Sequence, residues 1–295
     1  MTYLSMAHHM PDFTGKWIDN GRFELVRLLG AGGCGVVYLA VDHEDEAPAS
    51  SGAAPLQCAI KIIRKLEGPG FDCQKREVAL HHLVSEIPHV LPLYDAWEDE
   101  EYIYVVLEYC QSDLYRTIFD RGAYWGDDEL VRSVFLQILD AVHACHEKRV
   151  FHRDLKPENI LCSADGSEVF IADFGLATAN QLSTTFGCGS APYLSPGESI
   201  GREFSYQAYS TRRADVWALG VILANMVTGL CPWEKAVTED PRFCEYLLDD
   251  SYLERTLPAS RGVIQILKKL FRINPRSRPN LEQLRQSILA VDTFF

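Results

Sequence analysis

The residues from His152 to Asn159 combine side chains that can carry out the transfer of a phosphoryl group. In this run, His-Arg-Asp-Leu-Lys-Pro-Glu-Asn, Asp154 can accept the proton of an attacking hydroxyl, and Lys156 can steady the transferring group. Asn159 can hold a metal ion through its amide oxygen. The run matches the pattern H-R-D-L-x-x-x-N over its full length, so the match is specific.

A second acidic motif, Asp173-Phe174-Gly175, lies downstream. The Asp173 carboxylate can bind Mg²⁺ between the β- and γ-phosphates of a nucleotide. An isolated motif of this kind is common by chance, but the two motifs in this order and at this separation are not. Together they predict ATP and Mg²⁺ as cofactors, with Asn159 and Asp173 as the metal ligands.

A glycine cluster near the N-terminus has the spacing G-x-G-x-x-G-x-V. Glycines allow the backbone to approach phosphates closely, where amide N–H groups can bond the oxygens. Alone this string is weak evidence, because it also occurs in plain hairpins. A dinucleotide-binding fold is disfavoured, since it requires a helix after the glycines and strand-like residues follow here. The candidate nucleotide contacts are Gly30, Ala31, Gly32, Gly33, Cys34, Gly35 and Val37.

Lys61 lies in an apolar strand-like run that begins at Cys58. Burying an unpaired charge is costly, so this lysine requires anionic partners. Nucleotide phosphates and the carboxylate of Glu77, on the helix expected next, meet that requirement. The alternative is a surface lysine on an edge strand.

These residues lie on a chain whose first part favours strands and whose second part favours helices. Strands are predicted at 36–41, 58–63, 91–98 and 102–108, with one helix at 74–86, and later helices at 129–146, 215–227, 261–271 and 281–289. We expect a tail of residues 1–21, a β-rich lobe with a hinge over residues 22–110, and a helical lobe over residues 111–295. Such an α+β arrangement suits a ligand in the cleft between two lobes.

Composition excludes several other classes of protein. The chain has 295 residues and a formal net charge of −13, which disfavours nucleic acid as a partner and favours basic peptides, unless the charge serves solubility alone. Nine cysteines without a C-x-x-C pair indicate free thiols rather than a zinc or disulfide framework. The start lacks the pattern of a secretory signal. The longest apolar run, 216–231, is too short to span a membrane and predicts a buried helix.

With these motifs in place, the chain from Phe23 to Leu289 resembles a eukaryotic protein kinase catalytic domain. Later matches are the runs 215–220 and 274–279. The resemblance implies a two-lobed fold with ATP in the cleft, a hinge near Glu108–Cys110, and Leu107 guarding a back pocket. It also implies a hydrophobic spine of His152 and Phe174 resting on Asp215. Further ATP contacts implied in the same way are Ala59, Lys61, Glu108, Cys110, Asp113 and Leu161.

The resemblance extends to a subgroup. The run Phe186-Gly-Cys-Gly-Ser-Ala-Pro-Tyr-Leu-Ser-Pro196, and the stretch 231–241, are similar to fungal Ser/Thr kinases that restrain meiosis and respond to nutrients. This implies protein substrates carrying Ser or Thr, a monomer, and a cytoplasmic or nuclear location.

The chain departs from the family pattern at two places. Where the family has A-P-E, this sequence reads Ser195-Pro196-Gly197-Glu198. The glutamate of the family pairs with a late arginine, here Arg278, so either Glu198 shifts to reach it or the pair is lost. We expect the shift, because Gly197 gives the backbone freedom and a buried arginine without a partner is costly. The second departure is Cys34, where the glycine-rich loop often carries an aromatic residue.

The specificity for the acceptor is predicted from residues in and near the run from His152 to Asn159, the expected catalytic loop. Lys156 marks Ser/Thr rather than Tyr specificity in this family. Ser190 occupies the place of a hydroxyl beside Asp154 and Lys156, although it could be a simple turn serine. Glu158 and Asp113 could read a basic residue upstream of the acceptor, while Asp113 could instead cap a helix or bond the ATP ribose.

Regulation is predicted from the segment that holds Ser183, Thr184 and Thr185. Arg153 could pair with a phosphate there. No Lys or Arg occurs from Phe174 through Gly201, so we expect activity that does not require phosphorylation of this segment.

Two other functions stay open at this point. A pseudokinase scaffold would need a broken catalytic set, whereas Lys61, Glu77, Asp154, Asn159 and Asp173 are all present. A small-molecule kinase of related fold is disfavoured, because the run from Asp173 through Pro196 resembles a platform for protein substrates.

Overall fold

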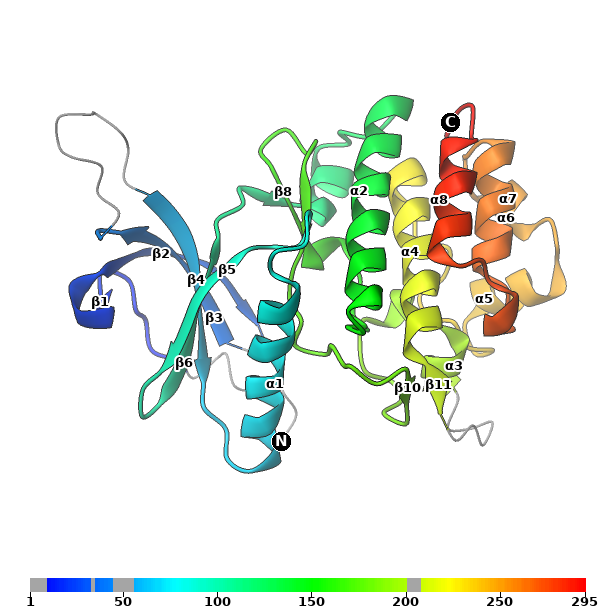
Figure 1. Ribbon diagram of the computed structural model, residues 1–295. Coiled ribbons are helices and arrows are strands. Elements are labelled where there is room, and N and C mark those ends of the chain that lie inside the picture. Colours follow the sequence, from blue (N-terminus) through cyan, green and yellow to red (C-terminus); the bar gives the residue numbers. More distant parts are fainter. Residues whose placement is uncertain (1–9, 33–34, 45–55, 201–207) are drawn as a thin grey trace. The chain divides into compact units, whose positions relative to one another are not determined.

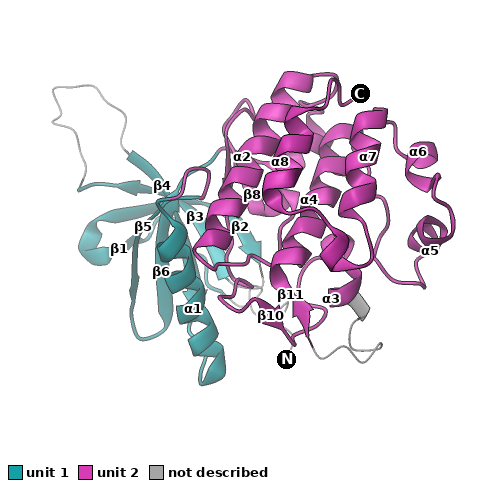
Figure 2. Cartoon of the chain, turned by 45° about the vertical axis from the view of Figure 1, so that its right-hand side comes forward, with its two compact units in different colours: residues 1–86, 91–110 teal, residues 87–90, 111–295 magenta. Residues whose placement is uncertain are grey.

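The computed structural model describes residues 10–32, 35–44, 56–200 and 208–295 (Figure 1). The chain forms two compact units, which are coloured separately in Figure 2. Unit 1 comprises residues 1–86 and 91–110, and unit 2 comprises residues 87–90 and 111–295. The α+β class is confirmed, and the predicted boundary after residue 110 agrees with this division apart from residues 87–90. The position of ATP stays a prediction.

Among its described residues, unit 1 contains a six-stranded antiparallel sheet and one α-helix (Figure 1). The order across the sheet is β1-β2-β3-β4-β6-β5. All four predicted strands and the predicted helix are present, because β-branched and aromatic residues favour the half-buried surface of a sheet. The bounds are Trp17–Ile18 (β1), Phe23–Gly32 (β2), Gly35–Asp42 (β3), Leu56–Arg64 (β4), Pro69–Val84 (α1), Leu93–Glu98 (β5) and Tyr102–Glu108 (β6).

Residues 10–21 belong to unit 1, so the expected tail is corrected over this stretch. Phe13 is only 4% exposed and packs edge-on against Tyr102, with 5.4 Å between ring centroids. Its backbone N–H donates to the hydroxyl of Tyr38 at 3.0 Å. A single buried aromatic contributes roughly 1.5–3 kcal/mol relative to exposure, which explains why the stretch packs on the sheet. Residues 1–9 lie outside the described residues.

Unit 2 is mainly helical, with short strands between the helices. The four predicted helices are confirmed as α2, α4, α7 and α8, and Figure 1 shows α2, α4 and α8 side by side. The helices are Asp128–Glu147 (α2), Pro196–Ile200 (α3), Thr211–Thr228 (α4), Pro241–Leu248 (α5), Tyr252–Thr256 (α6), Arg261–Leu270 (α7) and Leu281–Leu289 (α8). The strands are Ser112–Asp113 (β7), Ile160–Cys162 (β8), Val169–Ile171 (β9), Leu182–Ser183 (β10) and Tyr209–Ser210 (β11).

Helix α4 forms the centre of unit 2. It is buried along nearly its whole length, as the apolar run predicted. The side chain of Ser210 caps its first turn, and Gly229 ends it in the left-handed conformation that glycine adopts without strain. The helix therefore presents Asp215, near its N-terminal end, to the interior of unit 2. Among the described residues, no helix is both long and apolar enough to cross a membrane.

Candidate active site

Three of the predicted catalytic residues meet in unit 2. The hydroxyl of Ser190 donates to Oδ1 of Asp154 at 3.0 Å, and its backbone N–H donates to the same oxygen at 2.9 Å. The Lys156 ammonium lies 2.8 Å from the Ser190 hydroxyl and 3.1 Å from Oδ2 of Asp154. The prediction that Ser190 lies beside Asp154 and Lys156 is confirmed, so it is more than a turn serine.

Asn159 holds the other side of the same carboxylate. Its side-chain amide N–H donates to Oδ2 of Asp154 at 3.0 Å and to the Asp154 carbonyl at 2.9 Å. Because both bonds use the amide nitrogen, the amide oxygen stays available to another partner. This is the atom to which the sequence assigned a metal ion.

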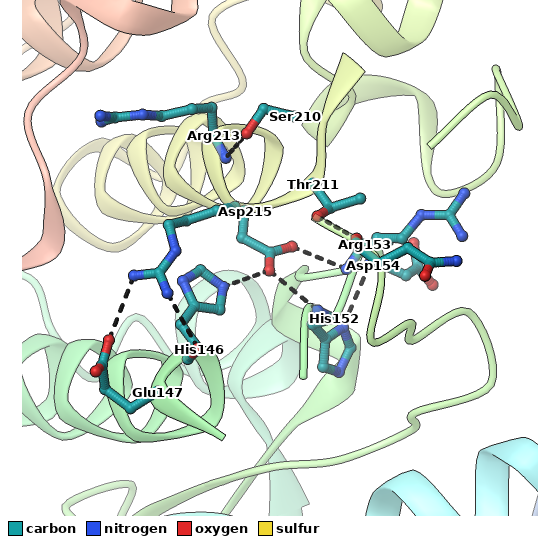
Figure 3. A network of polar contacts seen from close by, with 11 residues as sticks. His146, Glu147, His152, Arg153, Asp154, Ser210, Thr211, Arg213 and Asp215 are labelled. Carbon is teal, nitrogen blue, oxygen red and sulfur yellow. Dashed lines mark hydrogen bonds and ion pairs between the residues drawn. The ribbon is translucent and has the colours of Figure 1, made fainter. Parts of the chain in front are cut away.

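The catalytic loop rests on Asp215 of helix α4. The backbone N–H groups of His152 and Arg153 donate to its two carboxylate oxygens at 3.0 and 2.8 Å, and His146 Nε2 donates at 2.7 Å. Figure 3 shows these groups directed at Asp215. Burial would raise the pKa of Asp215, but the bond and the charge of His146, with the other donors, hold it below its usual value. A buried anion thus fixes the backbone just before Asp154.

The part of the predicted hydrophobic spine that comprises His152 and Phe174 is present. The rings of His152 and Phe174 lie 5.0 Å apart, and His152 Nε2 bonds the carbonyl of Ala172 at 2.9 Å. The neighbouring Asp173 adopts a positive φ of 60° and is exposed. A non-glycine residue rarely takes this conformation, and such strain occurs most often at functional positions.

In unit 1 the predicted ion pair is formed. Nζ of Lys61 on β4 lies 2.6 Å from Oε1 of Glu77 on α1, and both side chains are largely buried. The alternative of a surface lysine on an edge strand is wrong, because β4 lies between β3 and β6.

The glycine-rich segment forms the hairpin of β2 and β3 rather than a turn into a helix. A Cβ on Gly35 would lie 2.3 Å from the carbonyl oxygen of Ile62, so the adjacent strand requires glycine there. A Cβ on Gly30 or Gly32 would meet no atom within 4 Å. The protein itself does not require glycine at these two positions, which fits close approach by an external group. Gly33 and Cys34 lie outside the described residues.

The other predicted nucleotide contacts of unit 1 lie on strands β2, β3, β4 and β6 or just after them. Ala59 pairs with Leu107 between β4 and β6, and both are buried. Val37 pairs with Lys61 between β3 and β4. Ala31 lies in β2 opposite Val36, and Glu108 and Cys110 end this unit with partial exposure. An interaction that the sequence did not predict joins the carboxylate of Glu108 to the hydroxyl of Tyr94.

Asp113 and Leu161 are neighbours in unit 2, paired between β7 and β8. The Asp113 carboxylate accepts a hydrogen bond from the backbone N–H of Arg116 at 2.8 Å and lies 3.4 Å from the Arg116 guanidinium. The structure therefore bears out the capping alternative for Asp113. Its contact with the ATP ribose stays a prediction.

Glu198 and Arg278 do not pair, so the expected shift is wrong. Glu198 uses Oε2 to accept from the backbone N–H of Ser195 at 3.0 Å, three residues earlier at the start of α3. The Arg278 guanidinium instead donates to the carbonyls of Arg272 and Arg213 at 2.9 and 2.8 Å and lies 4.7 Å from the Trp217 ring. Glu198 accepts from Ser195 rather than pairing with Arg278 because Ser195 and Glu198 lie within one helical turn of each other.

This separation leaves two buried ionisable side chains that do not form an ion pair with each other. Glu198 is 2% exposed, and Oε1 has no hydrogen-bond partner among the described residues. Burial, with a further contribution from the Asp215 charge, raises the pKa of Glu198 to about 7. Burial lowers the pKa of Arg278 to about 10, while the nearby Glu198 charge opposes this shift.

Two residues of the site were not predicted from the sequence. His146 supports Asp215, and Tyr209 binds Arg153 through its hydroxyl at 3.1 Å. Neither lies in a motif, and each is separated from its partner by more than fifty residues. A polar aromatic residue at a position expected to be buried is the only signal that could have indicated them.

The site and the fold together define a protein kinase. A model of the protein kinase domain matches residues 23–289, and the chain belongs to the protein kinase family.

Its relatives include fungal Ser/Thr kinases. The chain is 38% identical over 289 residues to the negative regulator of sexual conjugation and meiosis of Schizosaccharomyces pombe, covering 90% of this chain and 59% of that protein. It is 35% identical to the Ser/Thr-protein kinase ksp1 of the same organism, covering 94% of this chain and 58% of that kinase. It is 30% identical to the Ser/Thr-protein kinase VHS1 of Saccharomyces cerevisiae, covering 74% and 50%. The chain thus spans little more than half of these relatives.

Proposed function

We propose that this chain transfers the γ-phosphoryl group of ATP to Ser and Thr hydroxyls of protein substrates. The observation that carries the proposal is the cluster of Asp154, Lys156 and Ser190, in which one carboxylate is held by a hydroxyl, an amide N–H and an ammonium. A general base must be oriented before it can accept a proton in the transition state. The ammonium beside it supplies positive charge to the transferring phosphoryl group.

The residues present fit Mg²⁺ as the family's metal. Asn159 keeps its amide oxygen available because its nitrogen is bound to Asp154, and Asp173 offers an exposed carboxylate. Hard oxygen donors of this kind are the protein ligands that Mg²⁺ accepts beside substrate phosphates. When bound, the metal supplies positive charge that neutralises the phosphate oxygens.

The residues of unit 1 support the nucleotide part of the proposal. Glu77 holds the Lys61 ammonium in one orientation, so this lysine can bind phosphates without first being ordered. A Cβ on Gly30 or Gly32 would meet no atom within 4 Å, so a phosphate can approach the backbone closely at these positions. We assign the ATP contacts to these residues and to Ala31, Val37, Ala59, Glu108, Cys110, Asp113 and Leu161.

A preference for basic residues upstream of the acceptor is the finer part of the proposal. Glu158 lies on the surface two residues after Lys156 and close enough to Tyr193 for its charge to contribute to that residue's raised pKa. The net charge of −13 favours basic peptides over acidic ones. We further propose a role in fungal meiosis or nutrient signalling, which the names of the relatives support, and we expect the chain to act as a monomer in the cytoplasm or nucleus.

The test is transfer from Mg-ATP to a degenerate Ser/Thr peptide array, with Asp154→Ala as the matched control. We expect phosphate incorporation that disappears in the variant, with Arg or Lys preferred before the acceptor. Intact nucleotide binding without incorporation would support the scaffold alternative instead. An array profile without basic preference would remove only the specificity part.

A further inference from the structure

Arg153 precedes Asp154, and the sequence predicted that it could pair with a phosphate in the activation segment, the stretch that holds Ser183, Thr184 and Thr185. In the structure its guanidinium already has three partners. Nη1 donates to the carbonyl of Leu176 and Nη2 to the carbonyl of Thr185, both at 3.3 Å. Nε donates to the hydroxyl of Tyr209 at 3.1 Å. The Arg153 guanidinium thus bonds two backbone carbonyls and one hydroxyl of the chain itself.

Tyr209 makes contact with the same segment in several ways. It is 7% exposed, and its hydroxyl, which accepts from Arg153, donates to the carbonyl of Thr185 at 3.2 Å. Its ring lies 5.7 Å from that of Phe186 and 6.0 Å from the Arg153 guanidinium. One side chain therefore joins the catalytic-loop arginine to two consecutive residues of the activation segment.

The backbone around Tyr209 holds the beginning of the segment. Strand β11 pairs with β10 through Ser183↔Tyr209 and Leu182↔Ser210. Next to this pair, the hydroxyl of Thr211 donates to the carbonyl of Asn180 at 2.8 Å. The segment is thus fixed to the start of α4 before it reaches Thr185.

The fixed segment leads directly to the catalytic residues. The backbone N–H of Gly187 donates to the carbonyl of Glu198 at 3.0 Å, and three residues later Ser190 bonds Asp154. A displacement of Thr185 would therefore move Ser190 and the Asp154 carboxylate to which it is bonded. No Lys or Arg from Phe174 through Gly201 is available to build a larger basic site for a phosphate.

We propose that Tyr209 is a positioning residue that holds Arg153 and the activation segment in the place where a phosphate would otherwise be needed. The inference rests on the proposed kinase function and adds its regulation. The hydroxyl supplies a polar partner for Arg153, and the buried ring anchors it against Phe186. Phosphorylation of the exposed Thr184 or Thr185 is then not required for activity.

The first experiment compares the chain before and after phosphatase treatment, with complete dephosphorylation verified by mass spectrometry. We expect kcat on a Ser/Thr peptide to stay within about twofold, since no bond at Arg153 requires a phosphate. Activity that is present before treatment and lost after it would overturn the inference and leave the kinase function standing. Inactivity in both states would overturn the kinase function, and the inference with it.

The second experiment removes only the hydroxyl, in Tyr209→Phe. We expect kcat of the dephosphorylated variant to fall about tenfold or more, because a hydrogen bond to a charged group is lost, with ATP affinity unchanged. The matched control is Tyr124→Phe, which removes another buried hydroxyl of unit 2 that donates to a backbone carbonyl, that of Gly166 at 2.9 Å. We expect Tyr124→Phe to leave kcat unchanged, although it should lower the thermal stability about as much as Tyr209→Phe does.

If kcat of Tyr209→Phe stays within about twofold of that of the unchanged chain, the hydroxyl does not position Arg153, and the inference is wrong. An equal fall of kcat in Tyr124→Phe would also contradict it, because loss of any buried hydroxyl would then have the same effect. If Tyr209→Phe does not fold, the phosphatase comparison on the unchanged chain still decides the inference.

Discussion

Asp215 and Glu198 are both buried carboxylates of unit 2, and they line the same small pocket beside Arg153 and Asp154. Asp215 accepts from three donors, and its pKa lies below the usual value despite complete burial. Glu198 accepts from one backbone N–H, and its pKa rises to about 7. Burial acts in the same direction on both groups, and the carboxylate with more donors and neighbouring histidines has the lowered pKa.

The largest expected effect concerns the carboxylate that Asp215 helps to position. Asp154→Ala should lower kcat by about 10²–10⁴-fold, because it removes the general base and the acceptor for Ser190. Steady-state peptide phosphorylation with a parallel nucleotide-binding titration measures this. Turnover within tenfold of the unchanged chain would assign the proton to another group.

Removal of the well-satisfied carboxylate should unfold the site. Asp215→Ala leaves two buried backbone N–H groups and His146 without their acceptor, and we expect a loss of about 3–5 kcal/mol in the free energy of unfolding. Urea denaturation measures it. The control is Asp140→Ala, whose ion pair with Arg285 is exposed and should contribute about 0–1 kcal/mol. Similar losses of unfolding free energy in both variants would mean that Asp215 contributes no more to stability than an exposed ion pair.

The poorly satisfied carboxylate should show its effect through pH. Because the pKa of Glu198 is raised in the folded state, folding takes up a proton between its usual value near 4.5 and about 7. Stability is therefore highest below that window and falls as pH rises through it, by at most about 3 kcal/mol. Glu198→Gln should remove this fall, which urea denaturation at pH 5.5 and pH 8 can detect. The same pH dependence in Glu198→Gln would assign the effect to another group.

The smallest expected effect is the coupling between Glu198 and Arg278. Arg278 donates to backbone carbonyls and lies against Trp217, so a double-mutant cycle of Glu198→Gln and Arg278→Met should give about 1 kcal/mol or less. A direct buried pair would give about 3–5 kcal/mol. A value in that higher range would restore the expected pairing and contradict the geometry described above.

The arrangement of some side chains could be predicted because the chemistry restricts the residue type. Phosphoryl transfer requires an oriented base, metal ligands of hard oxygen and a lysine held by a carboxylate, so Asp154 and the pair of Lys61 and Glu77 could be predicted. Most long helices and strands could also be predicted, since periodicity and apolar runs reflect which face is buried. The short helices α5 and α6 carried too few residues for a period to be visible.

Prediction failed where several partners compete for one group. Phe13 was assigned to a tail, because a single aromatic in a polar stretch does not reveal the sheet on which it packs. Glu198 was assigned to Arg278 by analogy, whereas a backbone N–H within the same turn was nearer.

The sequence by itself determined the fold class, the grouping of Ser190 with Asp154 and Lys156, and the pairing of Lys61 with Glu77, because the chemistry that their motifs predict leaves few alternatives. The tertiary structure alone decided which groups satisfy Arg153, Glu198 and Arg278. Arg153 and Arg278 bond backbone carbonyls of distant segments, whereas Glu198 accepts from a nearby backbone N–H, and every residue type carries such groups, except that proline lacks the N–H. Their availability depends on packing, so the sequence cannot reveal it.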